Sequence, residues 1–187
     1  MTVGKINNNT NIESKDASQC KKLRQVIRDA TRENLITEGE CDTLLRNISK
    51  NKELASMKIK QYLCSGASAT VFETEDGDVL KITEGSHYPL GRKQESFDVP
   101  IKKTGTAGIL HYYIEEKLMQ HNMTDGFVEI IKNEIRKKGY KPNDLDSWDL
   151  HQIGLSKDGK LYLLDPECAL HKSIFHALWY KFKNRNK

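Results

Sequence analysis

The sequence lacks the features that mark several large classes of protein. No apolar run approaches the roughly 18 residues of a membrane-spanning helix, so we expect no membrane span. The four cysteines, Cys20, Cys41, Cys64 and Cys168, form no Cys-x-x-Cys pair, which argues against a zinc site and a disulfide framework. Residues 1–18 are polar and lack the apolar core of a secretory signal. We therefore expect a cytoplasmic protein with free thiols and a disordered start.

Charge of one sign is not in large excess either. The 30 basic and 26 acidic side chains give a formal net charge of +4. The basic surplus gathers in 132–141 and in 181–187, and such runs are usually solvated faces. We therefore expect no nucleic-acid partner. The 187 residues suffice for one domain with an appendage.

Helical signals dominate the segment 19–57. Four apolar residues have the spacing of one helix face, namely Leu23, Val26, Ile27 and Ala30. Thr37 and Glu40 have the spacing of a capping box, in which each residue satisfies a backbone N–H of the other. We predict two helices, over about 18–34 and 38–51, that form a hairpin in front of the main domain.

Strand signals dominate much of the domain that we assign to 58–187. The expected strands are 59–63, 70–74, 79–82, 153–155 and 161–164. An Asp-Gly pair joins the second strand to the third, and another joins the fourth to the fifth. Asp-Gly between two β-rich runs is a strong hairpin signal. The fold class is therefore expected to be α+β, with a small antiparallel sheet.

The other segments of this domain are more mixed. Residues 84–108 are polar and irregular, and the run 109–118 favours a strand, with a helix as the alternative. Apolar residues within 127–135 form a helical stripe that Gly139 can end. A last helix is predicted over 170–182.

Two segments near the first hairpin are suited to phosphate. Gly66, Ala67 and Ser68 form a turn of small residues, whose backbone N–H groups can approach phosphates closely. Val71 would then cover a flat base; a tight hairpin with no ligand is the alternative. Lys81 has apolar neighbours on its strand, and it needs an anionic partner unless the strand is an exposed edge.

Two carboxylates bracket the second hairpin. Asp149 lies just before it and Asp165 at its end, and a hairpin brings its two ends together. Carboxylates with a nearby imidazole or amide, here His151 and Gln152, suit Mg²⁺, which prefers oxygen ligands and retains waters. The alternative is that both acids only terminate strands.

In this order, the segments resemble the motifs of the protein-kinase superfamily over residues 58–170. Residues 63–81 resemble its glycine-rich loop and lysine strand, and 114–118 resembles the hinge that binds adenine. Residues 149–151 resemble the catalytic loop of small bacterial and phage kinases, and 163–166 resembles the metal-binding strand end. The resemblance implies a minimal kinase-like fold, with a small β lobe and a reduced helical lobe.

The resemblance also implies roles for individual residues in an ATP- and Mg²⁺-dependent phosphotransferase. Lys81 would hold the α- and β-phosphates, and Asp149 would take the proton of the acceptor hydroxyl. Asp165 would bind Mg²⁺ with Gln152 or His151. The nucleotide site would comprise Gly66, Ala67, Ser68, Val71, Lys81, Glu95, Glu116 and Leu118.

Two assignments stay open. Glu95 is the preferred partner of Lys81, because a short helix could form around it; Glu115 and Glu116 are the alternatives. Asp149 is the preferred base, because it adjoins the hairpin directly, and the alternatives are Asp144 and Asp146.

Several positions depart from the family pattern. Only Gly66 remains of the three loop glycines, and Asp-Pro-Glu stands where most kinases have Asp-Phe-Gly. The family has an asparagine five residues after its catalytic aspartate, and Gly154 occupies that place after Asp149. If residues 153–155 are aligned with the corresponding hairpin strand of the family instead, Gln152 takes the asparagine position.

The expected function is a protein kinase acting on Ser, Thr or Tyr hydroxyls of another protein. Minimal kinases that resemble this chain occur among bacterial effectors, so a host protein is a candidate substrate, and secretion into a host cell is an alternative location. A pseudokinase-type module that binds a nucleotide or partner without catalysis is the second hypothesis. An interaction domain without nucleotide is the third, and a large separation between Lys81 and Asp165 would favour it.

Overall fold

The computed structural model describes residues 20–66, 69–88, 92–120, 124–145 and 152–171. Its helices are α1 Leu23–Arg32, α2 Glu38–Ile48, α3 Lys52–Ser56 and α4 Asp125–Lys137, with a short 3₁₀ helix at Pro166–Cys168. Its strands are β1 Lys21–Lys22, β2 Lys58–Ser65, β3 Ala69–Thr74, β4 Val79–Thr83, β5 Ile101–Ala107, β6 Leu110–Glu115, β7 Tyr140–Pro142, β8 Ile153–Leu155, β9 Leu161–Leu163 and β10 Ala169–His171. The protein is therefore α+β, as the sequence predicts.

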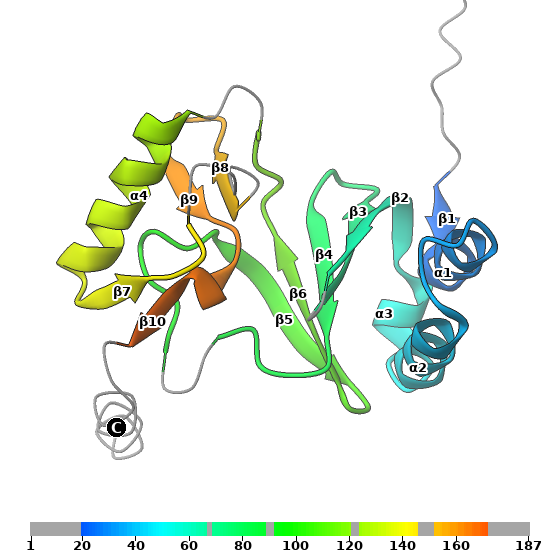
Figure 1. Cartoon of the computed structure of the whole chain (residues 1–187). Coiled ribbons are helices and arrows are strands. Elements are labelled where there is room, and N and C mark those ends of the chain that lie inside the picture. The colour runs from blue at the N-terminus through cyan, green and yellow to red at the C-terminus, as the bar shows by residue number, and fades with distance from the viewer. Residues whose placement is uncertain (1–19, 67–68, 89–91, 121–123, 146–151, 172–187) are drawn as a thin grey trace, which may run out of the picture.

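A six-stranded antiparallel sheet occupies the middle of the molecule (Figure 1). Its strand order is β1-β2-β3-β4-β6-β5, and two small sheets, β10-β7 and β8-β9, lie beyond it. Both predicted Asp-Gly hairpins are present. Gly77 and Gly159 have φ values of +80° and +82°, a backbone conformation that glycine adopts without steric cost.

The N-terminal helices cover one face of this sheet. Leu23, Val26, Ile27 and Ala30 of α1 are all buried, as their spacing predicts. They share one apolar cluster with residues of the sheet, including Phe72, Leu80, Ile82 and Tyr112. Since alternate residues of a strand point to opposite faces, these four define the outer face of the sheet, and their neighbours in sequence define the inner face.

The start of α2 has the predicted capping box. The Thr37 hydroxyl accepts the backbone N–H of Glu40 at 3.3 Å, and a Glu40 carboxylate oxygen accepts the backbone N–H of Thr37 at 2.9 Å. Both predicted helices are present. The second one ends at Ile48, and α3 follows as a separate short helix.

Strand β5 lies in the segment that we expected to be irregular. Residues 84–100 contain no strand or helix among those described, but Ile101–Ala107 pairs along β6. Its burial pattern is mostly exposed, with Lys102 and Lys103 on a sheet edge, so neither the alternation nor the apolar content of a typical strand is present.

The C-terminal part packs around α4, whose buried residues are Val128, Ile131 and Ile135. The predicted stripe is therefore shifted, because Ile130 is 51% exposed. The helix predicted over 170–182 is wrong at its start: Leu170 and His171 belong to β10, which pairs with β7. The rest of that segment lies outside the described residues.

Among the residues that the structure describes, no helix is long and apolar enough to cross a membrane.

Candidate functional site

Charged side chains are concentrated on the inner face of the sheet. Glu73 of β3, Lys81 of β4 and Glu115 of β6 alternate with the outer-face residues that pack against the helices. In the ladder between β4 and β6, Lys81 is opposite Tyr113 and Val79 is opposite Glu115. Lys81 and Glu115 are therefore diagonal neighbours, at a distance that a long side chain can span.

Lys81 contacts both this carboxylate and the end of β9. Its Nζ lies 2.8 Å from Glu115 Oε2, and it donates a hydrogen bond to the backbone carbonyl of Leu164 at 2.6 Å. The exposed fraction is 14% for the Lys81 side chain and 1% for that of Glu115. Since Leu164 precedes Asp165, the structure brings Lys81 to the strand end that the sequence marks as metal-binding.

The partner of Lys81 is not Glu95, which was the preferred prediction. The Glu95 carboxylate accepts a hydrogen bond from the Tyr140 hydroxyl at 3.0 Å and lies 3.4 Å from Lys138 Nζ. No helix forms around Glu95 in the described segment 92–100. The alternative, Glu115, takes this place, although it lies on a strand and not on a helix.

His87 is a member of the site that sequence reasoning missed. Its Nε2 lies 2.9 Å from Glu115 Oε1, and its ring stacks on Tyr113 with 4.5 Å between centroids. Its backbone N–H donates to the Tyr113 hydroxyl at 3.0 Å. A single histidine in a polar, irregular segment has no pattern that would have identified it.

Asp165 and Gln152 lie at neighbouring positions of the β8–β9 hairpin. The Gln152 carbonyl, just before β8, accepts the backbone N–H of Leu164 at 2.8 Å. Asp165 Oδ1 caps the short 3₁₀ helix by accepting the backbone N–H of Glu167 at 2.8 Å. The hairpin therefore brings the backbone of Gln152 next to Leu164, one residue before Asp165, and Gln152 stands where the hairpin alignment puts the family's asparagine.

Other predicted members of the metal and catalytic set lie outside the described residues. These are Asp149, His151 and the alternative base Asp146. Among the described residues, no group of three or more His, Cys, Asp or Glu side chains is placed to hold a metal ion. The described part of the site thus offers one carboxylate, Asp165, and one amide, Gln152, as oxygen ligands. Both suit Mg²⁺ in type.

The predicted phosphate loop is described only at its edges. The Gly66 N–H donates to the Ala69 carbonyl at 2.8 Å and closes the turn, and Gly66 itself is exposed. Ala67 and Ser68 lie outside the described residues. Val71 is half-buried on the inner face, where it is directly opposite Lys81 in the ladder between β3 and β4.

The predicted hinge connects the sheet to the hairpin β8–β9. The Glu116 N–H donates to the Pro100 carbonyl at 3.4 Å, and Leu118 is buried among Val99, Tyr162 and Leu164. A Cβ atom added to Gly154 would lie 2.5 Å from Leu118 Cβ, so only glycine fits against Leu118 here.

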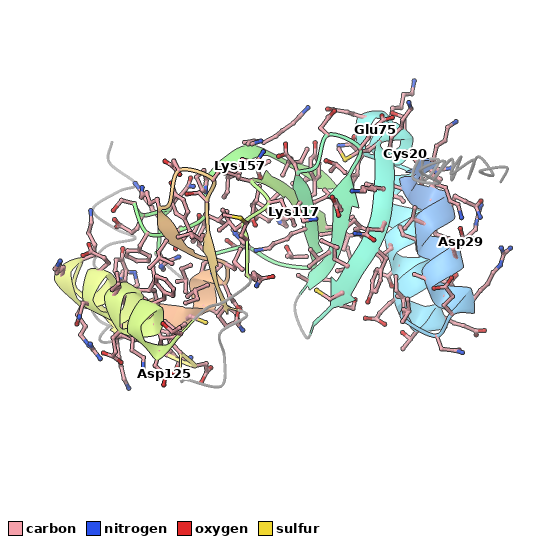
Figure 2. All side chains as sticks on the ribbon, turned by 90° about the horizontal axis from the view of Figure 1, so that it is seen from above. Cys20, Asp29, Glu75, Lys117, Asp125 and Lys157 are labelled. Carbon is pink, nitrogen blue, oxygen red and sulfur yellow. The ribbon has the colours of Figure 1, made fainter. Side chains whose placement is uncertain are left out.

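Lys117 ties this hinge to strand β3. Figure 2 shows Lys117 in the middle of the molecule, between Asp29 of α1 at one end and Asp125 of α4 at the other. Its Nζ lies 2.8 Å from Glu73 Oε2, which also accepts a hydrogen bond from Gln61 Nε2 at 2.7 Å. Burial raises the pKa of Glu73, but hydrogen bonds from Lys117, Gln61 and Lys60 outweigh it and lower the pKa overall.

A cavity of about 340 Å³ lies elsewhere, on the outer side of the sheet. It is lined by Thr43 and Leu44 of α2, by Thr70, Ile82 and Leu110 of the sheet, and also by Gly66 of the predicted phosphate loop. Because Ile82 and Leu110 belong to the cluster that packs under the helices, this cavity is separate from Lys81.

No protein-family model matches the chain, and a search of curated proteins finds no match. The inner-face geometry is therefore the basis for the function proposed below.

Proposed function

We propose that the chain is an ATP- and Mg²⁺-dependent phosphotransferase of the protein-kinase type, with its nucleotide site between the inner face of the sheet and the hairpin β8–β9. One observation carries this proposal. A largely buried lysine on an inner strand is paired with a buried carboxylate, and it also contacts the backbone beside Asp165, far along the chain. A triphosphate site needs a lysine with this placement, because its ammonium group can move from the carboxylate to a phosphate without being exposed to bulk water.

The strand arrangement supports a minimal kinase-like fold. Counted from β2, the lysine lies on the third strand of an antiparallel run, β2-β3-β4, which β6 and β5 extend. Protein kinases also have their lysine on the third strand, after a glycine-rich turn. Here α4 and the β8–β9 hairpin follow the sheet in sequence, and the hairpin ends at Asp165. This order is the one that the resemblance predicts.

The residues would divide the work as follows. Lys81 would hold the α- and β-phosphates, while Val71 and Leu118 would flank the base. Bound Mg²⁺ neutralises charge on the transferred phosphate, and Asp165 and Gln152 would hold it. Asp149 would orient the acceptor hydroxyl and accept its proton. The acceptor would be a hydroxyl of another protein, a host protein if the chain is a secreted effector.

The second candidate is a module that binds nucleotide, or a partner, without transfer. Asp165 favours it, because its Oδ1 already accepts the Glu167 N–H, which leaves fewer free lone pairs for a metal ion. Gly154 also leaves the asparagine position after Asp149 without a ligand side chain. The two candidates share the nucleotide site and differ only in catalysis.

Thermal unfolding with and without Mg-ATP tests the nucleotide site. A ligand at 100 times its dissociation constant stabilises the folded state by about 2.7 kcal/mol, which raises the midpoint. We expect wild type to shift, Lys81→Ala to lose most of the shift, and Asp165→Ala to lose its magnesium-dependent part. Lys102→Ala is the matched control, because Lys102 forms an exposed pair with Asp78 on the sheet edge. It should shift like wild type.

Phosphate transfer from labelled ATP then separates the two candidates. Transfer to a protein acceptor that Asp149→Ala abolishes supports the enzyme. A full Mg-ATP shift without transfer to any protein, or to the chain itself, supports the binding module. A wild type that does not shift at millimolar Mg-ATP would contradict the nucleotide site, and only a module that binds a partner without nucleotide would remain.

A further inference from the structure

Each oxygen of the Glu115 carboxylate lies close to a different basic side chain, but both oxygens and His87 Nε2 are buried without a geometrically formed hydrogen bond. Lys81 Nζ lies 2.8 Å from Oε2, and His87 Nε2 lies 2.9 Å from Oε1. The side chains of Glu115 and His87 are only 1% and 5% exposed, so water cannot replace either partner. An ionised carboxylate at this depth is costly unless both oxygens are compensated.

The position of His87 is set by contacts that do not involve Lys81. Its ring stacks on Tyr113, and its backbone N–H donates to the hydroxyl of the same tyrosine. The Tyr88 ring meets it edge-on, with 5.0 Å between centroids. Because Tyr113 is on the same strand face as Glu115, these contacts direct Nε2 at the carboxylate.

The two strands hold the rest of the group. Lys81 and Glu115 belong to neighbouring strands of one sheet, so their pair forms with the sheet itself and does not require a separate helix to dock. The segment that contains His87 continues to Asp98 and Val99, which pair with the end of β9 beside Leu164. The contacts of His87 itself are to Tyr88 and to Tyr113 and Glu115 of β6.

We propose that His87 is a positioning residue that holds the Glu115 carboxylate while Lys81 turns from Leu164 toward phosphate. This role rests on the proposed function, because it concerns the lysine of that nucleotide site. When Lys81 turns to phosphate, the His87 ring still lies beside Glu115 Oε1, and Glu115 stays in place to orient the lysine. Lys81, Glu115 and His87 then act as one triad.

A double-mutant cycle in the protein without nucleotide tests the triad. Lys81→Met removes the charge but keeps most of the side-chain stem, and His87→Phe keeps an aromatic ring against Tyr113 but removes the Nε2 atom that lies beside Glu115. Each single variant leaves Glu115 one partner, whereas the double variant leaves it none. We expect the urea midpoint of the double variant to fall further than the sum of the two single shifts. This excess should vanish in a Glu115→Gln background.

Lys103→Met provides the matched control for the cycle. Lys103 pairs with Glu53 on the exposed edge of the sheet. The urea midpoint of Lys103→Met with His87→Phe should therefore fall by the sum of the two single shifts and no further. Additive shifts for Lys81→Met and His87→Phe would overturn the triad, because His87 would then only fill space.

Mg-ATP binding tests the positioning role with a second readout. We expect His87→Phe to weaken Mg-ATP binding about tenfold, as is usual when a group that orients a ligand-binding residue is lost. His87→Gln, which restores a donor, should recover most of the affinity. Equal affinity in wild type and His87→Phe would overturn the role. If wild type does not bind Mg-ATP, the proposed function fails, while the cycle without nucleotide still decides whether the triad exists.

Discussion

The two faces of the central sheet differ in chemistry although the same strands build both. On the outer face, Phe72 and Leu80 are 0% exposed and pack under the helices. On the inner face, their neighbours include Lys81 and Glu73, whose charges are paired within the protein. The alternation of a strand thus separates a face that stabilises the fold from a face that can carry chemistry.

The faces also differ in which part of the chain supplies their partners. The outer face is covered by α1, α2 and α3, which precede β2 in the chain. On the inner face, Lys81 bonds to Leu164, 83 residues later, and Lys117 bridges to Glu73. Long-range contacts therefore build both faces, with the N-terminal helices on one side and the end of the hairpin β8–β9 on the other.

The largest expected effect distinguishes the faces by stability. Phe72→Ala should lower the free energy of unfolding by about 3–5 kcal/mol, because it leaves a cavity in the outer-face core. Val71→Ala, at the next position but half-buried on the inner face, should cost about 1 kcal/mol. Urea denaturation measures both. Equal losses would mean that both faces are packed core, and the comparison would fail.

An intermediate effect is expected where the hinge meets the hairpin. Gly154→Ala should destabilise by about 1–3 kcal/mol, because the new Cβ would overlap the Leu118 side chain. In a Leu118→Ala background, Gly154→Ala should lower the free energy of unfolding by less than it does in wild type. Gly39→Ala in α2 is the control, since nothing lies within 4 Å of its added Cβ and alanine favours a helix. Thermal midpoints measure both changes. If Gly154→Ala lowers the midpoint no more than Gly39→Ala does, the result contradicts the structure.

The smallest expected effect concerns the capping box at the start of α2, one of the helices that pack on the outer face, and this effect depends on pH. The side chain and then the backbone N–H of Thr37 donate to Glu40 and lower its pKa from 4.5. A lowered folded-state pKa stabilises the protein above 4.5, and this stabilisation is lost as the pH falls through the lowered pKa. Thr37→Ala should cost about 1 kcal/mol at pH 7.

The difference between wild type and Thr37→Ala should narrow below pH 4.5, since wild type then loses the charged half of its capping box. Urea unfolding between pH 7 and pH 3 measures this. Thr37→Ser, which keeps the capping hydroxyl, should leave the pH profile of wild type unchanged. A constant difference across this range would show that Glu40 does not contribute through its charge.

Local patterns account for the elements that were predicted correctly. The face of α1, the capping box of α2 and both Asp-Gly hairpins depend on residues a few positions apart, so their signals are present in any short window. Strand β5 escaped prediction because it is a lysine-bearing edge whose pairing with β6, not its own composition, makes it a strand.

Residue types marked the candidate site, but they did not reveal its connections. Lys81 and Asp165 stood out as a lysine among apolar residues and an acid at a strand end, and the structure brings their segments together. The carboxylate partner was misassigned to Glu95, because the prediction assumed a helix where the chain is irregular. His87 had no local signal, since its role depends on Tyr113 and Glu115.

The sequence by itself determined the α+β class, the alternation that makes one face of each strand apolar, and the residue types available for phosphate and magnesium. Those properties follow from side-chain chemistry and from the period of two along a strand. Only the tertiary structure decided which carboxylate meets Lys81, which histidine lies beside that carboxylate, and which strand forms the edge. These choices depend on strand order and register, which bring distant residues within 3 Å and leave no trace in a short stretch of sequence.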